Sequence, residues 1–378
     1  PAPKPRPARK TRREAEEELY QSIHDDHLWL NNPVMVRGLG LAPIVAMAIN
    51  GDYALMLCAT AALLLTATRV LAVAICHLTG NRFRAVVYTF SAAIVYIPAY
   101  LILYELFGSS LTLLGVYLPM MVVEPAIIKR LEAPELETLG EALRRGINNT
   151  IGLCVSILLV GALRELLGAG TVFGRTVLHF APLPLAAQPS WRPPGPPWAA
   201  RMSITNRRRC VTCMLTASTE LTVLQAVAQF AFYVVLAVFA ENVVFSRAMG
   251  VSRLIKLVND PEIHTWQYCT PVILVQLGSA PLGWLTMTYV SPTLRAVLPD
   301  WLPIAALRPL IYLCCAAVAM AAVWLLLGLL PAAWRRPCRE QLPIATCTCS
   351  VLGTLLLCAG QNYSLLQSTA FGLGSGLG

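Results

Sequence analysis

Long apolar stretches separated by short polar breaks dominate this chain. Those of membrane-spanning length are residues 53–78, 85–107, 147–167, 214–240, 267–290 and 305–330. A helix needs roughly 20 apolar residues to cross the hydrocarbon core of a bilayer. The apolar stretches that are marginal for a full crossing are residues 33–49, 112–128, 243–258 and 342–358. Short stretches of this kind fit half-helices or re-entrant segments inside a bundle. The pattern predicts an all-α polytopic membrane protein.

A degenerate sequence pattern occurs twice along the chain. Residues 31–43 and 241–253 both begin with a polar pair, continue as an apolar run with one arginine, and reach a glycine. Each copy is followed by a short apolar segment that is entered through Leu-Pro, at 118–119 and at 342–343. Duplicated apolar segments interrupted by Gly or Pro point to a site at the membrane midplane. We therefore expect two tandem inverted-repeat helix units with short half-helices.

Polarity and proline content divide the chain further. Residues 1–30 form a polar tail, 31–181 the first helical unit, 182–210 a linker rich in Pro and Arg, and 211–378 the second unit. Proline breaks helices, so the linker is not expected to contain a span. The glycine-rich end, residues 372–378, is not expected to finish a span, which predicts a second unit that is incomplete at its C-terminal end.

The composition supports the class of membrane proteins and limits the kinds of partner that the chain is expected to bind. Apolar residues make up 56% of the chain and charged residues 13%, against about 25% charged residues in a typical soluble domain. The net charge of +9 comes mostly from basic residues at segment ends, as the positive-inside bias produces, so the expected partner is the lipid bilayer and no nucleic acid. The basic start is followed by polar residues to Asp26. No cleavable signal peptide is therefore expected, and the first apolar segment should direct insertion with a cytoplasmic N-terminus.

The twelve cysteines do not form the pattern of a disulfide framework. Most lie in or beside apolar segments, where cysteine behaves as a small hydrophobic residue. Cys210 and Cys213 have the CxxC spacing of zinc ligands, but no second CxxC completes a site. No P-loop, nucleophile elbow or GxGxxG motif is present, so the sequence offers no basis for soluble enzyme chemistry.

Several motifs resemble the paired six-helix membrane subunits of the Rnf electron-transport complex and of the sodium-translocating NADH:quinone reductase. Asn31–Pro43 is similar to the family's NNP…LGLCP, and Leu114–Pro119 to its LGIFLP. Leu163–Gly174, LRELLGAGTVFG, resembles the E-type subunit and is the most specific match. In the second unit, Glu241–Phe245 and Leu342–Gly353 resemble the A-type subunit more loosely. The resemblance implies an E-type unit fused to a diverged, truncated A-type unit.

This resemblance implies a function. The chain would be a multi-pass subunit, in the bacterial inner membrane, of a complex that couples electron transfer from ferredoxin or NADH to Na⁺ or H⁺ translocation. It would be non-catalytic by itself or act as an electron relay, with other membrane subunits and subunits carrying flavins and iron–sulfur clusters as partners. Two alternatives remain open: a cluster-free scaffold or regulatory paralogue of such a subunit, and an inverted-repeat transporter of ions or small solutes.

The resemblance also implies a [2Fe–2S] cluster held by four cysteines on the half-helices. Carried over to this sequence, three ligand positions hold Ala42, Pro125 and Ser252, and only Cys349 matches. Cys347 is near enough in sequence to contribute if the backbone there is extended. Alanine and proline cannot ligate iron, and serine is a poor substitute for a thiolate. We therefore expect that the cluster is not retained; the alternative is a cluster with a ligand from elsewhere in the chain.

Three ionisable residues are candidates for an ion pathway. Glu124 stands beside Pro125, where freed carbonyls and a carboxylate can hold Na⁺ or a proton, unless Glu124 simply meets water at the end of a half-helix. Arg164 and Glu165 lie at the end of a predicted span. Their role is in an ion pathway or in docking, or they are an interfacial pair that ends the helix.

Overall fold

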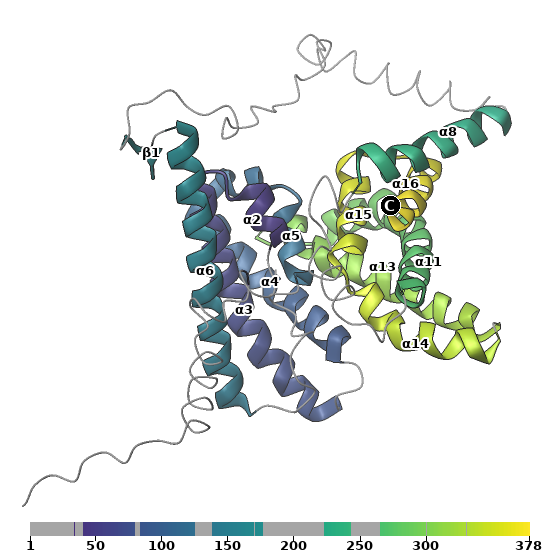
Figure 1. Ribbon diagram of the computed structural model, residues 1–378, viewed down its shortest axis with the longest axis horizontal. Helices are drawn as coiled ribbons and strands as arrows, with labels where there is room; N and C mark the ends of the chain where they lie inside the picture. Colours follow the sequence, from purple (N-terminus) through teal and green to yellow (C-terminus); the bar gives the residue numbers. More distant parts are fainter. Residues whose placement is uncertain are drawn as a thin grey trace, which may run out of the picture.

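The computed structural model describes Val34 and residues 41–79, 84–124, 138–169, 171–176, 223–242, 265–299, 301–329 and 331–378. In these ranges five helices are long and apolar enough to cross a membrane, or six if one bent pair of helices counts as a single span. Large apolar side chains on their outer faces are exposed, as expected for surfaces in contact with lipid. The prediction of an all-α polytopic membrane protein is confirmed (Figure 1).

The first unit is built on three long helices: α3 (Gly51–Thr79), α4 (Arg84–Phe107) and α6 (Leu139–Ala169). α3 lies between the other two and packs against both. The short helix α2 (Leu41–Met47) precedes α3 and also packs against α6. The predicted spans 53–78 and 85–107 correspond closely to α3 and α4.

Small residues allow α3 and α6 to approach closely. A Cβ atom added to Gly161 of α6 would lie 2.6 Å from the Cβ of Ala54, and one added to Gly146 would lie 3.4 Å from the Cα of Thr66. Between these contacts the hydroxyls of Thr66 and Thr150 share a hydrogen bond of 3.1 Å. Such contacts are typical of membrane helices, which associate through packing and hydrogen bonds rather than through hydrophobic burial.

Short helices follow α4. A 3₁₀ helix, η2 (Gly108–Leu114), leads to α5 (Tyr117–Met120) and to a further 3₁₀ turn, η3 (Met121–Val123). Gly108 and Gly115 both have positive φ, a conformation that favours glycine, and these residues separate the pieces. The described part of the predicted marginal segment 112–128, residues 112–124, is therefore a broken element.

The second unit is centred on α11 (Thr265–Leu285), which packs against α13, α14, α15 and α16. Its other helices are α8 (Val223–Val235), the π-helical segments η6 (Leu236–Ala240) and η7 (Thr286–Val290), α12 (Ser291–Val297), α13 (Ile304–Leu326), η8 (Leu327–Leu329), α14 (Ala332–Thr346), α15 (Cys349–Gly360) and α16 (Leu365–Leu377). The predicted spans 267–290 and 305–330 correspond to α11 with η7 and to α13 with η8.

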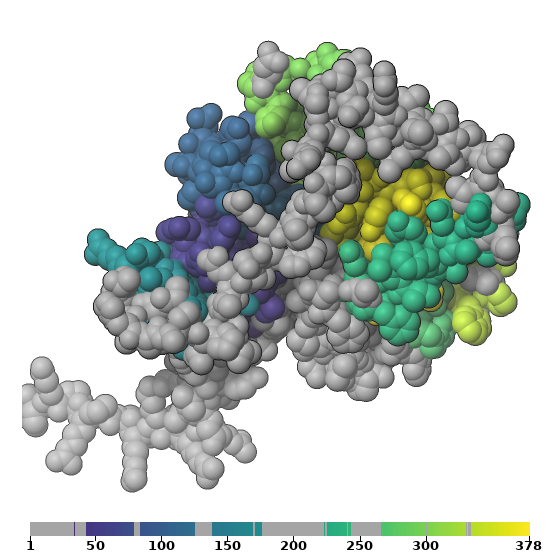
Figure 2. All heavy atoms as spheres, turned by 90° about the horizontal axis from the view of Figure 1, so that it is seen from above, coloured from purple at the N-terminus to yellow at the C-terminus, as the bar shows by residue number. Residues whose placement is uncertain are grey.

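The glycine-rich C-terminal segment is helical. Ser364 begins α16 with a capping box in which its side chain accepts from the N–H of Gln367. The glycines then let α16 lie very close to its neighbours: a Cβ on Gly372 would lie 2.6 Å from Ala280 of α11, and one on Gly374 would lie 2.5 Å from the carbonyl oxygen of Val234 in α8. With 13 residues α16 is too short to cross a bilayer alone. In Figure 2 its yellow surface borders the green surface of α8.

The two units share one hydrophobic core. α13 packs against α4 and α5, and α15 packs against α5. Buried side chains from both sides, including Tyr96 and Leu118 of the first unit and Tyr312 and Leu352 of the second, belong to one contiguous cluster. Figure 1 shows this junction between the blue and the yellow-green helices.

Candidate functional site

The short helices of both units meet at this junction. α2 packs against α5, and α5 packs against α15. In Figure 1, α5 lies on the side of the first unit that faces the second, with α2 on one side of it and α15 on the other. The half-helix segments of the sequence pattern that the structure describes are therefore neighbours, although they are far apart in sequence.

Cys347 and Cys349 lie at a break between two helices. α14 ends at Thr346, α15 begins at Cys349, and the two helices are bent by 53°. Thr348 between them is extended, and its hydroxyl donates to the carbonyl of Ala345 at 2.9 Å. Both cysteines are 3% exposed. The sequence analysis required an extended backbone for Cys347 to contribute a ligand together with Cys349, and Thr348 has that conformation.

Glu124 follows η3, which packs against α3, α4 and α5 of the first unit. It has an extended backbone, its N–H donates to the carbonyl of Met121, and its side chain is 2% exposed. Val122 and Val123 before it are fully buried. The side chain is therefore buried within the protein instead of meeting water at a helix tip. Ionisable residues at such depth are costly and usually mark a function.

The remaining cluster positions hold no cysteine. Ala42 lies in α2, while Pro125 and Ser252 are outside the described residues. Ala42 and Pro125 carry no donor atom that could replace a thiolate, whatever their position. Within the described ranges, no three His, Cys, Asp or Glu side chains are grouped so that they could hold a metal ion. The four positions that the family resemblance assigns to the cluster therefore hold one cysteine in this chain and do not fit a four-cysteine [2Fe–2S] cluster by themselves.

Arg164 binds the end of the half-helix α2. Its Nη1 donates to the carbonyl oxygen of Val45 at 2.7 Å. Val45 lies in the last turn of α2, where carbonyl groups have no partner within the helix. A cation at a helix C-terminus is also favoured by the helix dipole. Arg164 therefore fixes α2 to α6.

Glu165 binds the beginning of the next helix. Its Oε2 accepts from the N–H of Gly51, the first residue of α3, at 2.8 Å. Its Oε1 accepts from the N–H of Gly174 at 2.8 Å and from the hydroxyl of Thr171 at 2.9 Å. The Glu165 side chain is buried, with 8% of its surface exposed. The hydrogen bonds that its two oxygens accept compensate the charge for the loss of water. Adjacent charges on α6 thus hold both sides of the α2–α3 junction.

The motif that follows Glu165 is a β-hairpin. β1 (Thr171–Val172) and β2 (Arg175–Thr176) are joined by Phe173 and Gly174, whose φ values are 50° and 74°. Positive φ at both positions is the signature of a type I′ turn. The ring of Phe173 lies over Gly51, where an added Cβ would be only 2.5 Å away.

Sequence reasoning identified Arg164 and Glu165 but not their partners. Both side chains bind backbone groups of segments that precede or follow α6, and α6 itself continues to Ala169. Gly51 was not singled out in the sequence, and Phe173 and Gly174 were recognised only as the end of the motif Leu163–Gly174. The Phe-Gly pair shortly after Gly168 and Gly170 was the available signal for a hairpin turn.

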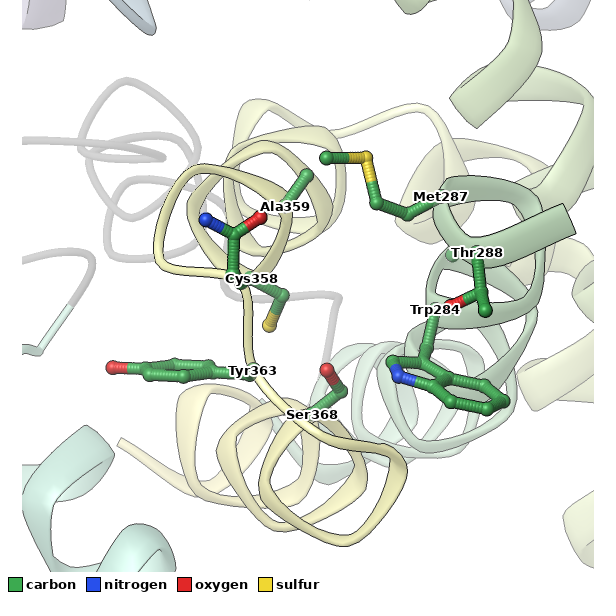
Figure 3. A pocket seen from close by; sticks show the side chains of 9 residues that line it. Trp284, Met287, Thr288, Cys358, Ala359, Tyr363 and Ser368 are labelled. Atoms are coloured by element: carbon green, nitrogen blue, oxygen red, sulfur yellow. The ribbon is translucent and has the colours of Figure 1, made fainter. Parts of the chain in front are cut away.

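A cavity of about 250 Å³ lies at the other end of α15. Its lining includes Trp284 on α11, Tyr363 after α15, Cys358 and Ser368. In Figure 3 the indole and phenol rings stand on opposite sides, and the Cys358 thiol and Ser368 hydroxyl point between them. The π-helical turn η7 contributes Met287 and Thr288 to the rim. No residue of this cavity was a predicted site residue.

Comparison with known proteins identifies the family. The sequence model of the Rnf-Nqr subunits, described as membrane proteins, matches residues 20–191 and 230–378. The chain belongs to this family. As an Rnf-Nqr subunit with several apolar spans it is an integral membrane protein.

Curated relatives of this Rnf-Nqr subunit are named as the E subunits of ion-translocating oxidoreductase complexes. The protein of Haemophilus influenzae strain PittEE is 29% identical over 160 residues, which are 41% of this chain and 66% of the relative. That of Pseudoalteromonas atlantica is 33% identical over 159 residues, 41% of this chain and 67% of the relative. That of Thioalkalivibrio sulfidiphilus is 32% identical over 162 residues, 43% of this chain and 71% of the relative. The chain thus spans about two thirds of the length of these relatives. No solved structure gives a significant match.

Proposed function

We propose that this chain is a membrane subunit of an ion-translocating oxidoreductase complex of the Rnf/Nqr type. The observation that carries the proposal is the family match on both sides of the predicted linker, over residues 20–191 and 230–378. It is supported by the names of the E-type relatives and by short helices that meet between the units. On this proposal, residues 31–181 are an E-like unit and residues 211–378 an A-like unit.

The second part of the proposal concerns the cluster. The family scaffold is kept, while Ala42 and Pro125 remove two of the four ligands that the resemblance implies. The chain's own residues then bind no cluster and catalyse no reaction; they provide helices that span the membrane and contact the neighbouring subunits. Flavin and iron–sulfur groups belong to those partner subunits, in a bacterial inner membrane. This favours the cluster-free scaffold among the alternatives.

Co-purification tests the assignment directly. The tagged chain is expressed in its own bacterium, extracted from inner membranes in a mild detergent and isolated beside an unrelated multi-pass protein with the same tag. We expect that flavin and iron–sulfur subunits of an oxidoreductase complex accompany the chain and are absent from the control. Recovery of the chain alone, together with ion flux when it is reconstituted alone in liposomes, would instead establish the transporter alternative.

Glu124 is our candidate for the ion pathway. A buried carboxylate directly after the short helices α5 and η3 can take up Na⁺ or a proton in a way that an amide of the same shape cannot. Glu124→Gln should therefore leave assembly of the complex unchanged and abolish ion translocation by the reconstituted complex. Glu105→Gln, at an exposed position of α4, is the matched control and should translocate normally. Normal translocation by the Glu124 variant would exclude this residue.

A further inference from the structure

Cys58 and Cys154 form a reciprocal contact between α3 and α6. The Sγ of Cys58 donates to the carbonyl oxygen of Cys154 at 3.4 Å, and the Sγ of Cys154 donates to the carbonyl oxygen of Cys58 at 3.6 Å. Each side chain therefore reaches across to the other residue's backbone. Neither cysteine occupies a position that the family resemblance assigns to a cluster.

The helix packing on both sides fixes this contact. Towards one end, Gly161 lies against Ala54, and towards the other, Gly146 and Thr150 lie against Thr66. These contacts keep the helix axes close where the cysteines face each other. A disulfide needs Cα atoms about 4.4–6.8 Å apart and Cβ atoms that face each other. Each thiol reaches the carbonyl oxygen of the opposite residue, so the two side chains lie at the same contact between the helices, and rotation of the side chains would bring the sulfur atoms towards each other.

We propose that Cys58 and Cys154 are a modification site at which oxidation forms a disulfide that joins α3 to α6. Both S–H bonds break and one S–S bond forms, so the pair loses two electrons and two protons. A lipid-soluble two-electron acceptor takes them: a quinone becomes a quinol in a membrane, or a diazene such as diamide becomes a hydrazine in a test tube. The acceptor must be lipid-soluble because both cysteines lie within membrane-spanning helices.

The other neighbouring cysteines are less suited to this reaction. Cys314 and Cys315 are consecutive on α13, where side chains diverge by about 100°. Cys347 and Cys349 are separated by Thr348 at a helix break. Among these pairs of described cysteines, only a link between residues 58 and 154 would connect two long helices of the first unit. It would fix α3 and α6 near the junction that Arg164 and Glu165 secure.

Oxidation of the purified full-length chain in liposomes tests the proposal. The chain is treated with diamide, which enters membranes, or with oxidised glutathione, which does not, and digested without reduction. We expect a cross-linked pair of peptides containing Cys58 and Cys154 after diamide and much less after glutathione. The midpoint of thermal unfolding should rise by about 5 °C or more, because a link across a long loop restricts the unfolded chain.

Matched variants separate this pair from general cysteine chemistry. Cys58→Ala and Cys154→Ala should each abolish the cross-link and the thermal shift. The double variant Cys76→Ala/Cys315→Ala removes two buried thiols elsewhere and should retain both effects. Differential alkylation of the unmodified protein gives an answer that does not depend on any variant folding. Alkylatable thiols at positions 58 and 154 after full diamide treatment, or preferred cross-links to other cysteines, would overturn the proposal.

Discussion

Arg164 and Glu165 show how two adjacent charges are accommodated near the end of a helix that is long and apolar enough to cross a membrane. They bind backbone groups that helix ends leave without partners: the carbonyl of Val45 and the N–H of Gly51. The sequence indicated that the pair was important, since it falls within the most specific family motif. It did not indicate what the pair binds, because the partners lie more than 100 residues earlier, with separations of 119 and 114.

Removing the charge of Glu165 should loosen the α2–α3 junction. Glu165→Gln puts an amide nitrogen where one of the oxygens now accepts, so at least one donor among Gly51, Thr171 and Gly174 loses its partner. Hydrogen bonds to charged groups contribute about 1.5–3 kcal/mol, and we expect a loss of stability in this range. Thermal unfolding measured by circular dichroism checks it, with the exposed Glu105→Gln as control. Equal midpoints for the two variants would contradict the assigned role.

At the scale of the element, the pattern of apolar residues predicted where the long helices lie, but it predicted their first and last residues less accurately. We expected a span at 147–167, but α6 begins at Leu139 and includes charged residues such as Glu141 and Arg145. The helix can continue beyond the apolar stretch because a helix satisfies its backbone hydrogen bonds within its own segment, whatever the polarity of its side chains. Conversely, the predicted span 214–240 is described only from Val223, where an apolar helix shorter than a span leads into η6.

Close packing of α3 and α6 depends on the absence of a side chain at one position. Gly161→Ala would place a Cβ 2.6 Å from that of Ala54 and should force the helices apart. Overpacking of this kind costs about 1–3 kcal/mol, more than the ~1 kcal/mol that alanine contributes in helix propensity. We therefore expect a lower unfolding midpoint.

The same substitution elsewhere on α6 provides the control for this experiment. Gly140 has no atom within 4 Å of an added Cβ, so Gly140→Ala should leave stability unchanged or raise it slightly. Thermal unfolding of both variants in the same detergent makes the comparison. Similar shifts for the two would mean that helix propensity, and not helix contact, determines the result.

At the scale of the whole molecule, the duplicated motifs predicted short half-helices around a common site. The structure places the half-helices that it describes next to one another. α2 and α15 both pack against α5, Glu124 follows α5 and η3, and Cys349 begins α15. Sequence alone did not reveal the hairpin over Gly51, the contact between Cys58 and Cys154, or the cavity beside Trp284. Each of these depends on side chains from segments distant in sequence, which hydrophobic periodicity does not relate to one another.

Restoring the missing ligands tests the assignment of both units together. If residues 31–181 and 211–378 correspond to the E-type and A-type subunits, positions 42, 125, 252 and 349 converge in the folded chain. Ala42→Cys/Pro125→Cys/Ser252→Cys would then supply three thiolates beside Cys349, the donor set that holds such a cluster. After reconstitution with iron and sulfide, we expect that this triple variant binds both and that the unmodified chain does not.

Adding Cys349→Ala to the triple variant should remove the bound iron. A triple variant that binds no more iron than the unmodified chain would contradict the correspondence, and a cluster in the unmodified chain would show that a ligand comes from elsewhere.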